Sequence, residues 1–126
     1  MPNSATQPQV FHVLKGEARK LKRTPFGTVG TLFSREGIEA VWVSKRDEAR
    51  DPGWFSQPMI DLIVLVAGRL RVEYENTDTV PVVLGPGDLL VLPANTRCRA
   101  YRWPRKSRGA TVFVAVYPAG PGREGD

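Results

Sequence analysis

The side chains that most often do chemistry in proteins are scarce in this chain of 126 residues, which has one histidine, His12, and one cysteine, Cys98. A single cysteine excludes an intramolecular disulfide, so nothing in the sequence calls for an oxidising compartment. A single histidine excludes the usual catalytic zinc and non-haem iron sites that take two or more imidazoles. For His12 itself, the sequence favours an imidazole satisfied by a backbone carbonyl or water over a metal ligand.

Positive charge is the second feature that could bind a partner. The chain has 18 Lys and Arg against 13 Asp and Glu, a formal charge of +5, and eleven of the basic residues lie in two short segments. In the segment 97–108, Arg97, Arg99, Tyr101 and Trp103 would share one face of a strand, and arginines beside aromatic rings are typical of phosphate contact with base stacking. A solvated barrel exterior is the favoured alternative, because no nucleic-acid-binding motif accompanies them.

The elements that must position these groups are strands. Short runs rich in Val, Ile, Leu, Thr and aromatic residues alternate with turns of Gly, Pro, Asn and Asp, as in an antiparallel sandwich or barrel. Helix-forming residues are confined to 16–23 and 45–50, which allows at most one or two short helical turns. We therefore expect an all-β protein with strands at residues 10–14, 28–34, 38–44, 60–66, 69–75, 80–84, 89–92, 97–103 and 110–117.

Chain length sets the domain organisation, because a chain of 126 residues holds one core. We expect a single domain over 9–118 between flexible tails at 1–8 and 119–126. The polar, proline-containing opening lacks a signal-peptide pattern, and the longest apolar stretch, 62–67, is far below the roughly 20 residues of a membrane helix. The expected location is therefore the cytoplasm, with no membrane partner.

Two motifs in the second half of the chain resemble the cupin superfamily of small jelly-roll barrels. In the first, Asp61 stands seven positions before the strand-ending Gly68; in the second, a Gly-Asp pair at Gly87 opens a run that ends at Cys98. The resemblance implies an antiparallel jelly-roll β-barrel of the small cupin-2 type, with the two motifs on facing strands. The superfamily holds isomerases, dioxygenases, sugar-binding regulators and storage proteins, so the resemblance implies a fold and no particular reaction.

The residues that the resemblance places at the usual cupin metal centre cannot form such a centre. The resemblance places the family's two neighbouring histidines at Phe55 and Gln57, its acidic ligand at Asp61 and its last histidine at Cys98. Phe55 has no donor atom and Gln57 is a weak neutral donor, so the set falls short of the three or four ligands of a tight site. Even offsets put Phe55, Gln57 and Asp61 on one strand face. We expect a cavity of unchanged geometry with no metal and no other cofactor.

Cys98 and Arg102 each leave two interpretations open. Cys98 is either a nucleophilic thiolate promoted by the nearby Arg102 or an inert apolar filler in place of the histidine; the filler is favoured because no base lies near it in sequence. Arg102 shares the barrel-facing side of its strand with Cys98, and a guanidinium in an apolar cavity needs an anion. Its partner is either Asp61, the favoured pairing, or a carboxylate, phosphate or sulfate group of a ligand.

The leading hypothesis is a metal-free, non-catalytic cupin that binds a small polar or anionic ligand at the barrel mouth, with aromatic side chains as its apolar wall. The ligand would contact Trp42, Trp54, Phe55, Gln57, Asp61, Cys98 and Arg102. One alternative is a metal-dependent isomerase or dioxygenase that uses Gln57, Asp61 and Cys98 as a degenerate ligand set. The other is nucleic-acid or anionic-polymer binding by the basic segments. A homodimer is also expected, because strand 28–34 needs its edge covered.

Overall fold

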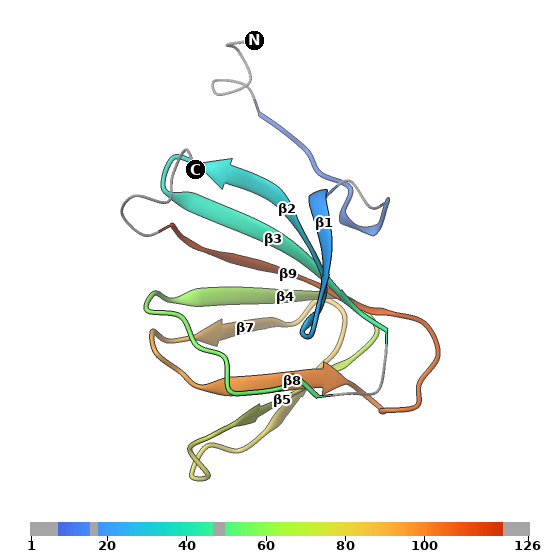
Figure 1. Cartoon of the computed structure of the whole chain (residues 1–126), viewed down its shortest axis with the longest axis vertical. Helices are drawn as coiled ribbons and strands as arrows, with labels where there is room; N and C mark the ends of the chain where they lie inside the picture. The colour runs from blue at the N-terminus through green and yellow to red at the C-terminus, as the bar shows by residue number, and fades with distance from the viewer. Residues whose placement is uncertain (1–7, 16–17, 47–49, 120–126) are drawn as a thin grey trace.

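The chain folds into two antiparallel β-sheets that face each other (Figure 1). The computed structural model describes residues 8–15, 18–46 and 50–119. The larger sheet has the strand order β1-β2-β3-β9-β4-β7, and the smaller has the order β6-β5-β8. The strands are β1 Arg19–Thr24, β2 Gly27–Arg35, β3 Ile38–Lys45, β4 Asp61–Ala67, β5 Leu70–Tyr74, β6 Val82–Leu84, β7 Leu89–Leu92, β8 Cys98–Arg102 and β9 Thr111–Pro118. The expected all-β, antiparallel jelly-roll fold is confirmed.

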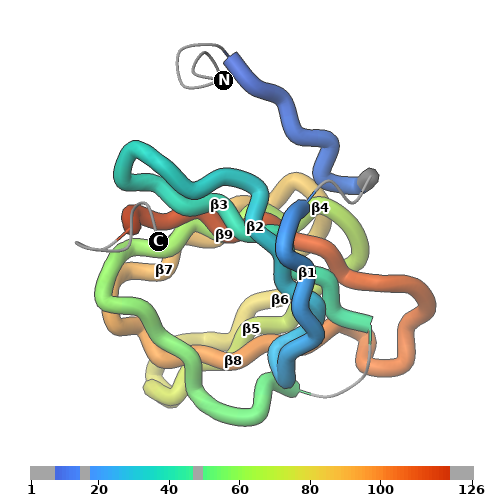
Figure 2. Tube along the Cα trace, turned by 45° about the horizontal axis from the view of Figure 1, so that its top comes forward, coloured from blue at the N-terminus to red at the C-terminus, as the bar shows by residue number. Residues whose placement is uncertain are grey.

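The core lies between the two sheets, which curve toward each other (Figure 2). Its side chains follow the period of two that a strand imposes: in β4, Asp61, Ile63 and Leu65 are buried, and the residues between them are half-buried. The smaller sheet contributes residues such as Leu70 and Val72, which are almost completely buried. Apolar strand residues thus form one core, with Asp61 at its margin.

The glycine of the first cupin motif is required by its surroundings. Gly68 follows β4 with a φ of +75°, a conformation that favours glycine. A Cβ atom at this position would lie 2.8 Å from Oγ1 of Thr111, which is closer than such contacts can be. The motif therefore marks a tight reversal against β9.

Two expectations about the start of the chain are wrong. Residues 10–14 form no strand, and a short 3-10 turn covers Val13–Lys15 instead. The expected helical segment 16–23 largely forms β1, which pairs with β2 through a hairpin. In that hairpin Thr24 Oγ1 donates a hydrogen bond to the Gly27 carbonyl over 2.8 Å and accepts one from the Phe26 N–H over 3.0 Å. Exposed lysines and arginines suit β1 because they are common on edge strands.

The strand that was expected to need a dimer partner is already covered. β2, which spans the expected strand 28–34, lies between β1 and β3, so this argument for a homodimer is wrong. Of the expected tails, residues 1–7 and 120–126 lie outside the described residues, as do residues 47–49 of the second expected helical segment. In the part of the chain that is described, no helix has the length and apolar character needed to cross a membrane.

Candidate ligand-binding site

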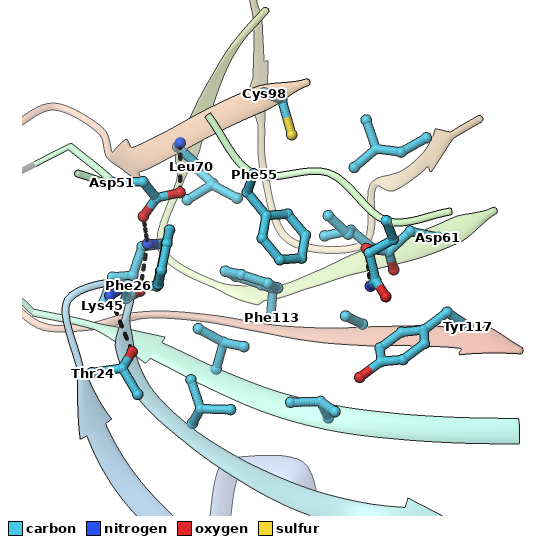
Figure 3. A pocket seen from close by; sticks show the side chains of 18 of the residues that line it. Thr24, Phe26, Lys45, Asp51, Phe55, Asp61, Leu70, Cys98, Phe113 and Tyr117 are labelled. Carbon is cyan, nitrogen blue, oxygen red and sulfur yellow. Dashed lines mark hydrogen bonds and ion pairs between the residues drawn. The ribbon is translucent and has the colours of Figure 1, made fainter. Parts of the chain in front are cut away.

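A cavity of about 600 Å³ lies between the two sheets, a size in the range of small-molecule sites. Polar groups occupy two ends of it: Asp61 lies at one, and Lys45 with Asp51 at the other, with Phe55 and Phe113 between them (Figure 3). The remaining wall is largely aliphatic and comes from both sheets: Val29, Val41, Val43, Ile63, Leu70, Val72, Leu92, Ala100 and Ala115.

The structure brings together the four residues to which the resemblance assigned the cupin metal-ligand positions. Phe55, Gln57, Asp61 and Cys98 all line the cavity. Phe55 does not lie in a regular strand; it forms an isolated bridge with Cys98, in which the Phe55 N–H reaches the Cys98 carbonyl over 2.7 Å and the reverse bond measures 2.9 Å. The Gln57 carbonyl accepts a hydrogen bond from the Asn95 N–H over 2.6 Å. A loop anchored at these points therefore presents Phe55 and Gln57 to the cavity.

Asp61 is the group in the cavity whose hydrogen bonding is incomplete. It begins β4 and is only 4% exposed. Gln57 Nε2 donates to its Oδ2 over 3.2 Å, whereas Oδ1 is buried without a hydrogen-bond partner among the residues that the structure describes. Burial raises the pKa of the carboxyl above its usual value of 3.8, and the hydrogen bond from Gln57 opposes this to a smaller extent. Asp61 thus brings a buried carboxyl group with incomplete hydrogen bonding to the wall of an otherwise largely apolar cavity.

The buried ion pair at the other end was not predicted from the sequence. Lys45 Nζ contacts Oδ1 of Asp51 and donates to the Phe26 carbonyl over 2.5 Å. Asp51 Oδ2 accepts the Ala100 N–H over 2.9 Å, and the two side chains of the pair are 7% and 9% exposed. The sequence pattern of β3 could have indicated a buried lysine, because Lys45 continues the inward-facing positions of Val41 and Val43. The pair ties the end of β3 to β8.

Cys98 is buried and lines the cavity, in agreement with the interpretation of an apolar filler. Burial, with a further contribution from the negative charges of Asp51 and Asp61, raises the pKa of the thiol to about 11. A thiolate is therefore scarce at neutral pH, which disfavours a nucleophilic role.

Arg102 does not face the cavity, and its expected pairing with Asp61 is wrong. Its Nε donates to the Arg105 carbonyl over 3.2 Å, and its Nη1 donates to the Gly109 carbonyl over 3.0 Å. These acceptors belong to the loop between β8 and β9, so the guanidinium is held at the end of its strand. The sequence could not indicate this, because only the folded loop brings the carbonyls within reach.

The two tryptophans that were expected to wall the ligand lie elsewhere. Trp42 lies on the face of β3 opposite to Val41 and Val43. Its Nε1 donates a hydrogen bond to the Val13 carbonyl over 2.8 Å. Trp54 is covered by the guanidinium of Arg99, which lies 4.2 Å from the ring centroid. Neither is among the residues that line the cavity. His12 is exposed and also lies outside the cavity lining.

Residues of the basic segment at β8 contact the acidic residue of β5, Glu73. Glu73 accepts hydrogen bonds from Tyr101 Oη over 2.9 Å, Arg50 Nη1 over 3.2 Å and Arg99 Nε over 3.3 Å. Burial alone would raise the pKa of Glu73, but these donors outweigh it and lower the pKa below its usual 4.5. Tyr101 is 5% exposed, so it offers no free face for a nucleic-acid base. These contacts support the solvated barrel exterior over nucleic-acid binding.

The donor set in the cavity does not fit the metal that the cupin fold usually holds. Phe55 presents only carbon, and Gln57 offers a single neutral amide oxygen, which is a weak donor. The thiol of Cys98, with its raised pKa, would have to lose its proton to act as a ligand. Across residues 8–15, 18–46 and 50–119, no group of three or more His, Cys, Asp or Glu side chains is placed to hold a metal ion. The degenerate ligand set therefore lacks the donors of a tight site.

Solved structures resemble this fold, although no protein-family model and no curated protein sequence matches the chain. A protein of Klebsiella pneumoniae with a double-stranded β-helix domain has a TM-score of 0.66 at 13% identity, over 91% of this chain and 93% of that one. A cupin 2 conserved barrel protein of Salinispora arenicola has a TM-score of 0.64 at 11% identity, over 90% and 89%. A cupin-like protein of Thermotoga maritima has a TM-score of 0.63 at 16% identity, over 88% and 81%.

At these identities the likeness shows the fold and carries no function. The chain is a cupin-fold protein, with an antiparallel jelly-roll of the small cupin-2-like type. At the positions where the resemblance would place the three cupin histidines, the chain has Phe55, Gln57 and Cys98.

Proposed function

We propose that this cupin-fold protein binds a small polar organic molecule inside the barrel, without a metal and without catalysing a reaction on it. The observation that carries this proposal is the buried carboxyl of Asp61, which lines a cavity of about 600 Å³ and whose Oδ1 has no hydrogen-bond partner among the residues that the structure describes. A buried acceptor that is left unpaired costs about 1–3 kcal/mol, and a donor group on a ligand would offset that cost. The aliphatic and aromatic wall suits the apolar part of such a molecule.

The experiment is a thermal-shift screen of small polar compounds against the protein and two leucine variants. Ala115→Leu places extra side-chain volume in the cavity, whereas Ala40→Leu makes the same change on the outer face of the same sheet, since Ala40 pairs with Val116. A compound that binds inside the barrel raises the melting temperature of the parent protein and of Ala40→Leu but not of Ala115→Leu. Equal shifts in all three proteins, or no shift with any compound, would contradict the proposal.

We also propose that the chain forms a homodimer through the outer face of the larger sheet. Six outward-facing residues of β7, β4 and β9 form two apolar rows in register: Val91, Leu62 and Val116, and Leu89, Val64 and Val114. Leu89 and Val91, on an edge strand, are 56% and 48% exposed. None of the six is charged, and two-fold symmetry would set an identical uncharged surface against them.

The cytoplasm remains our proposal for the location of the protein. The single cysteine supports it, because this residue cannot form a disulfide within the chain.

A further inference from the structure

The sign of the charge that the cavity presents follows from which charged groups are buried in it. The expectation of an anionic ligand depended on Arg102, and that guanidinium is bonded to carbonyls of the loop between β8 and β9. The charged groups that line the cavity are Lys20, Lys22, Lys45, Asp51 and Asp61. The effect of each charge on a ligand depends on whether the group is paired and on how exposed it is.

The three lysines do not give the cavity a preference for anionic ligands. Lys45 is paired with Asp51, so the two charges largely cancel at that end of the cavity. Lys20 and Lys22 belong to the edge strand β1 and are exposed, so water screens them. A charge in water acts about fourfold more weakly than one at the effective dielectric constant of a buried site. The buried carboxyl of Asp61, with Oδ1 unpartnered, is then the dominant feature.

Tyr117 adds a second feature that suits a cation. It follows Val116, which pairs with Leu62, so it lies at the same end of the cavity as Asp61 (Figure 3). The face of an aromatic ring attracts an ammonium group. A carboxylate and an aromatic ring at one end of an apolar cavity are together complementary to a cation that carries an apolar body.

We infer that the ligand of this cavity is a small organic amine whose ammonium group pairs with the carboxylate of Asp61 and whose apolar body lies along Ile63, Phe113 and Ala115. The inference rests on the proposed binding function and adds the charge of the ligand. An ammonium both supplies the missing donor and neutralises the buried carboxylate, whereas a hydroxyl group supplies the donor alone. A carboxylate ligand would place two negative charges together in an apolar site.

Three probes of similar size and different charge test this inference: 2-phenylethylamine, 2-phenylethanol and phenylacetate. Binding is measured by calorimetry to the parent protein, to Asp61→Asn and to Asp78→Asn, which makes the same change at an exposed turn position. The amine is expected to bind the parent protein and Asp78→Asn alike, at least tenfold more tightly than the alcohol or the acid. Asp61→Asn is expected to lose at least tenfold in affinity for the amine and to keep its affinity for the alcohol.

The inference is overturned if the alcohol or the acid binds the parent protein as tightly as the amine, or if Asp61→Asn keeps its affinity for the amine. If the bound probe is then still excluded by Ala115→Leu, the charge assignment has failed and the proposed function stands. If none of the three probes binds, the inference has also failed, and the wider screen with the leucine variants decides the proposed function separately.

Discussion

Gln57 donates a hydrogen bond from Nε2 to Oδ2 of Asp61 over 3.2 Å, and within the described part of the chain the other carboxylate oxygen, Oδ1, has no partner. The resemblance to cupins assigns metal ligands to both positions, and in this chain the two side chains are hydrogen-bonded to each other. The hydrogen bond restrains the orientation of this carboxyl group in the cavity wall. A cavity whose wall contains no imidazole in this way has a fixed polar group among apolar side chains.

Replacing Asp61 by asparagine should stabilise the protein in a pH-dependent way. Because burial raises the pKa of Asp61 in the folded state, the folded protein holds this proton more tightly than the unfolded chain does. The contribution of this proton to the free energy of unfolding is fully present below the pKa of Asp61 in the unfolded chain. It is lost as the pH rises through the pKa of Asp61 in the folded protein. Above that range, Asp61→Asn should be more stable than the parent protein by about 1 kcal/mol.

Denaturant unfolding from pH 3 to pH 8 measures this difference, with Asp78→Asn as the control for a change of net charge. The gain should be absent at the acidic end and grow as the pH rises. A gain that is independent of pH, or one shared by Asp78→Asn, would show that Asp61 is not the group responsible.

Cys98 should react slowly with alkylating reagents in the folded protein. Its pKa of about 11, against an ordinary 9.0, leaves roughly 100-fold less thiolate at pH 8 than in a free thiol, before any steric protection. Iodoacetamide labelling followed by mass spectrometry measures the rate directly, since this is the single thiol of the chain. Unfolding in guanidinium should restore the rate of a free thiol. Rapid labelling of the folded protein at pH 7 would indicate an activated nucleophile instead.

The buried pair of Lys45 and Asp51 should matter far more to stability than an exposed pair. Lys45→Met leaves the Asp51 carboxylate buried without its cation and should cost about 3 kcal/mol. Arg97→Met, which breaks the pair with Glu75 at side-chain exposures of 52% and 46%, should cost less than about 1 kcal/mol. The double variant Lys45→Met/Asp51→Asn should cost less than the sum of the single changes. Equal costs for Lys45→Met and Arg97→Met in chemical denaturation would contradict this ranking.

The purified, untagged protein should contain no stoichiometric transition metal. Gln57, Asp61 and Cys98 supply one neutral amide, one carboxylate and one protonated thiol, a donor set that is too weak for tight binding. Elemental analysis after dialysis without chelator measures the content of the parent protein and of Asp61→Ala. One metal per chain that disappears in Asp61→Ala would restore the metal-dependent enzyme as the better hypothesis.

A lysine on the outer face of β7 should separate the proposed dimer. Val91→Lys inserts a charge among the apolar residues of the larger sheet, whereas Val83→Lys makes the same change at a similarly exposed position on β6. Light scattering should give twice the chain mass for the parent protein and Val83→Lys, and a single chain mass for Val91→Lys. A monomeric parent protein, or a dimer that Val91→Lys leaves intact, would rule out this interface.

Most of the fold could be predicted because strands and turns leave local signals. The alternation in β4 and the glycine turn at Gly68 depend on residues that are close in sequence. The sequence pattern did not predict β1, because this lysine- and arginine-rich segment has no alternation of apolar and polar residues. Its strand conformation depends on pairing with β2. An edge strand is thus the element for which a local pattern is least informative.

The candidate site could be predicted only in part. Phe55, Gln57, Asp61 and Cys98 follow from the two motifs, and they do line one cavity. The roles of Arg102 and Lys45 depend on partners that folding brings near: the Gly109 carbonyl for the first and Asp51 for the second. The alternation of residues along a strand indicates the face of the sheet on which a side chain begins. It does not indicate where the charged end of a long side chain lies, because that end can bind an acceptor at the end of the strand.

The position of β1 has a consequence for how fast a bound molecule could be exchanged. This strand supplies Lys20, Lys22 and Thr24 to the cavity wall, yet it lies at the edge of the sheet and pairs there with β2. Edge strands open at a lower free energy than the strands of a core. The cavity is already partly open to solvent, and fraying of β1 would widen its opening while β3, β9 and β4 stay paired. A local opening of one hairpin would then speed the exchange of a ligand without global unfolding of the fold.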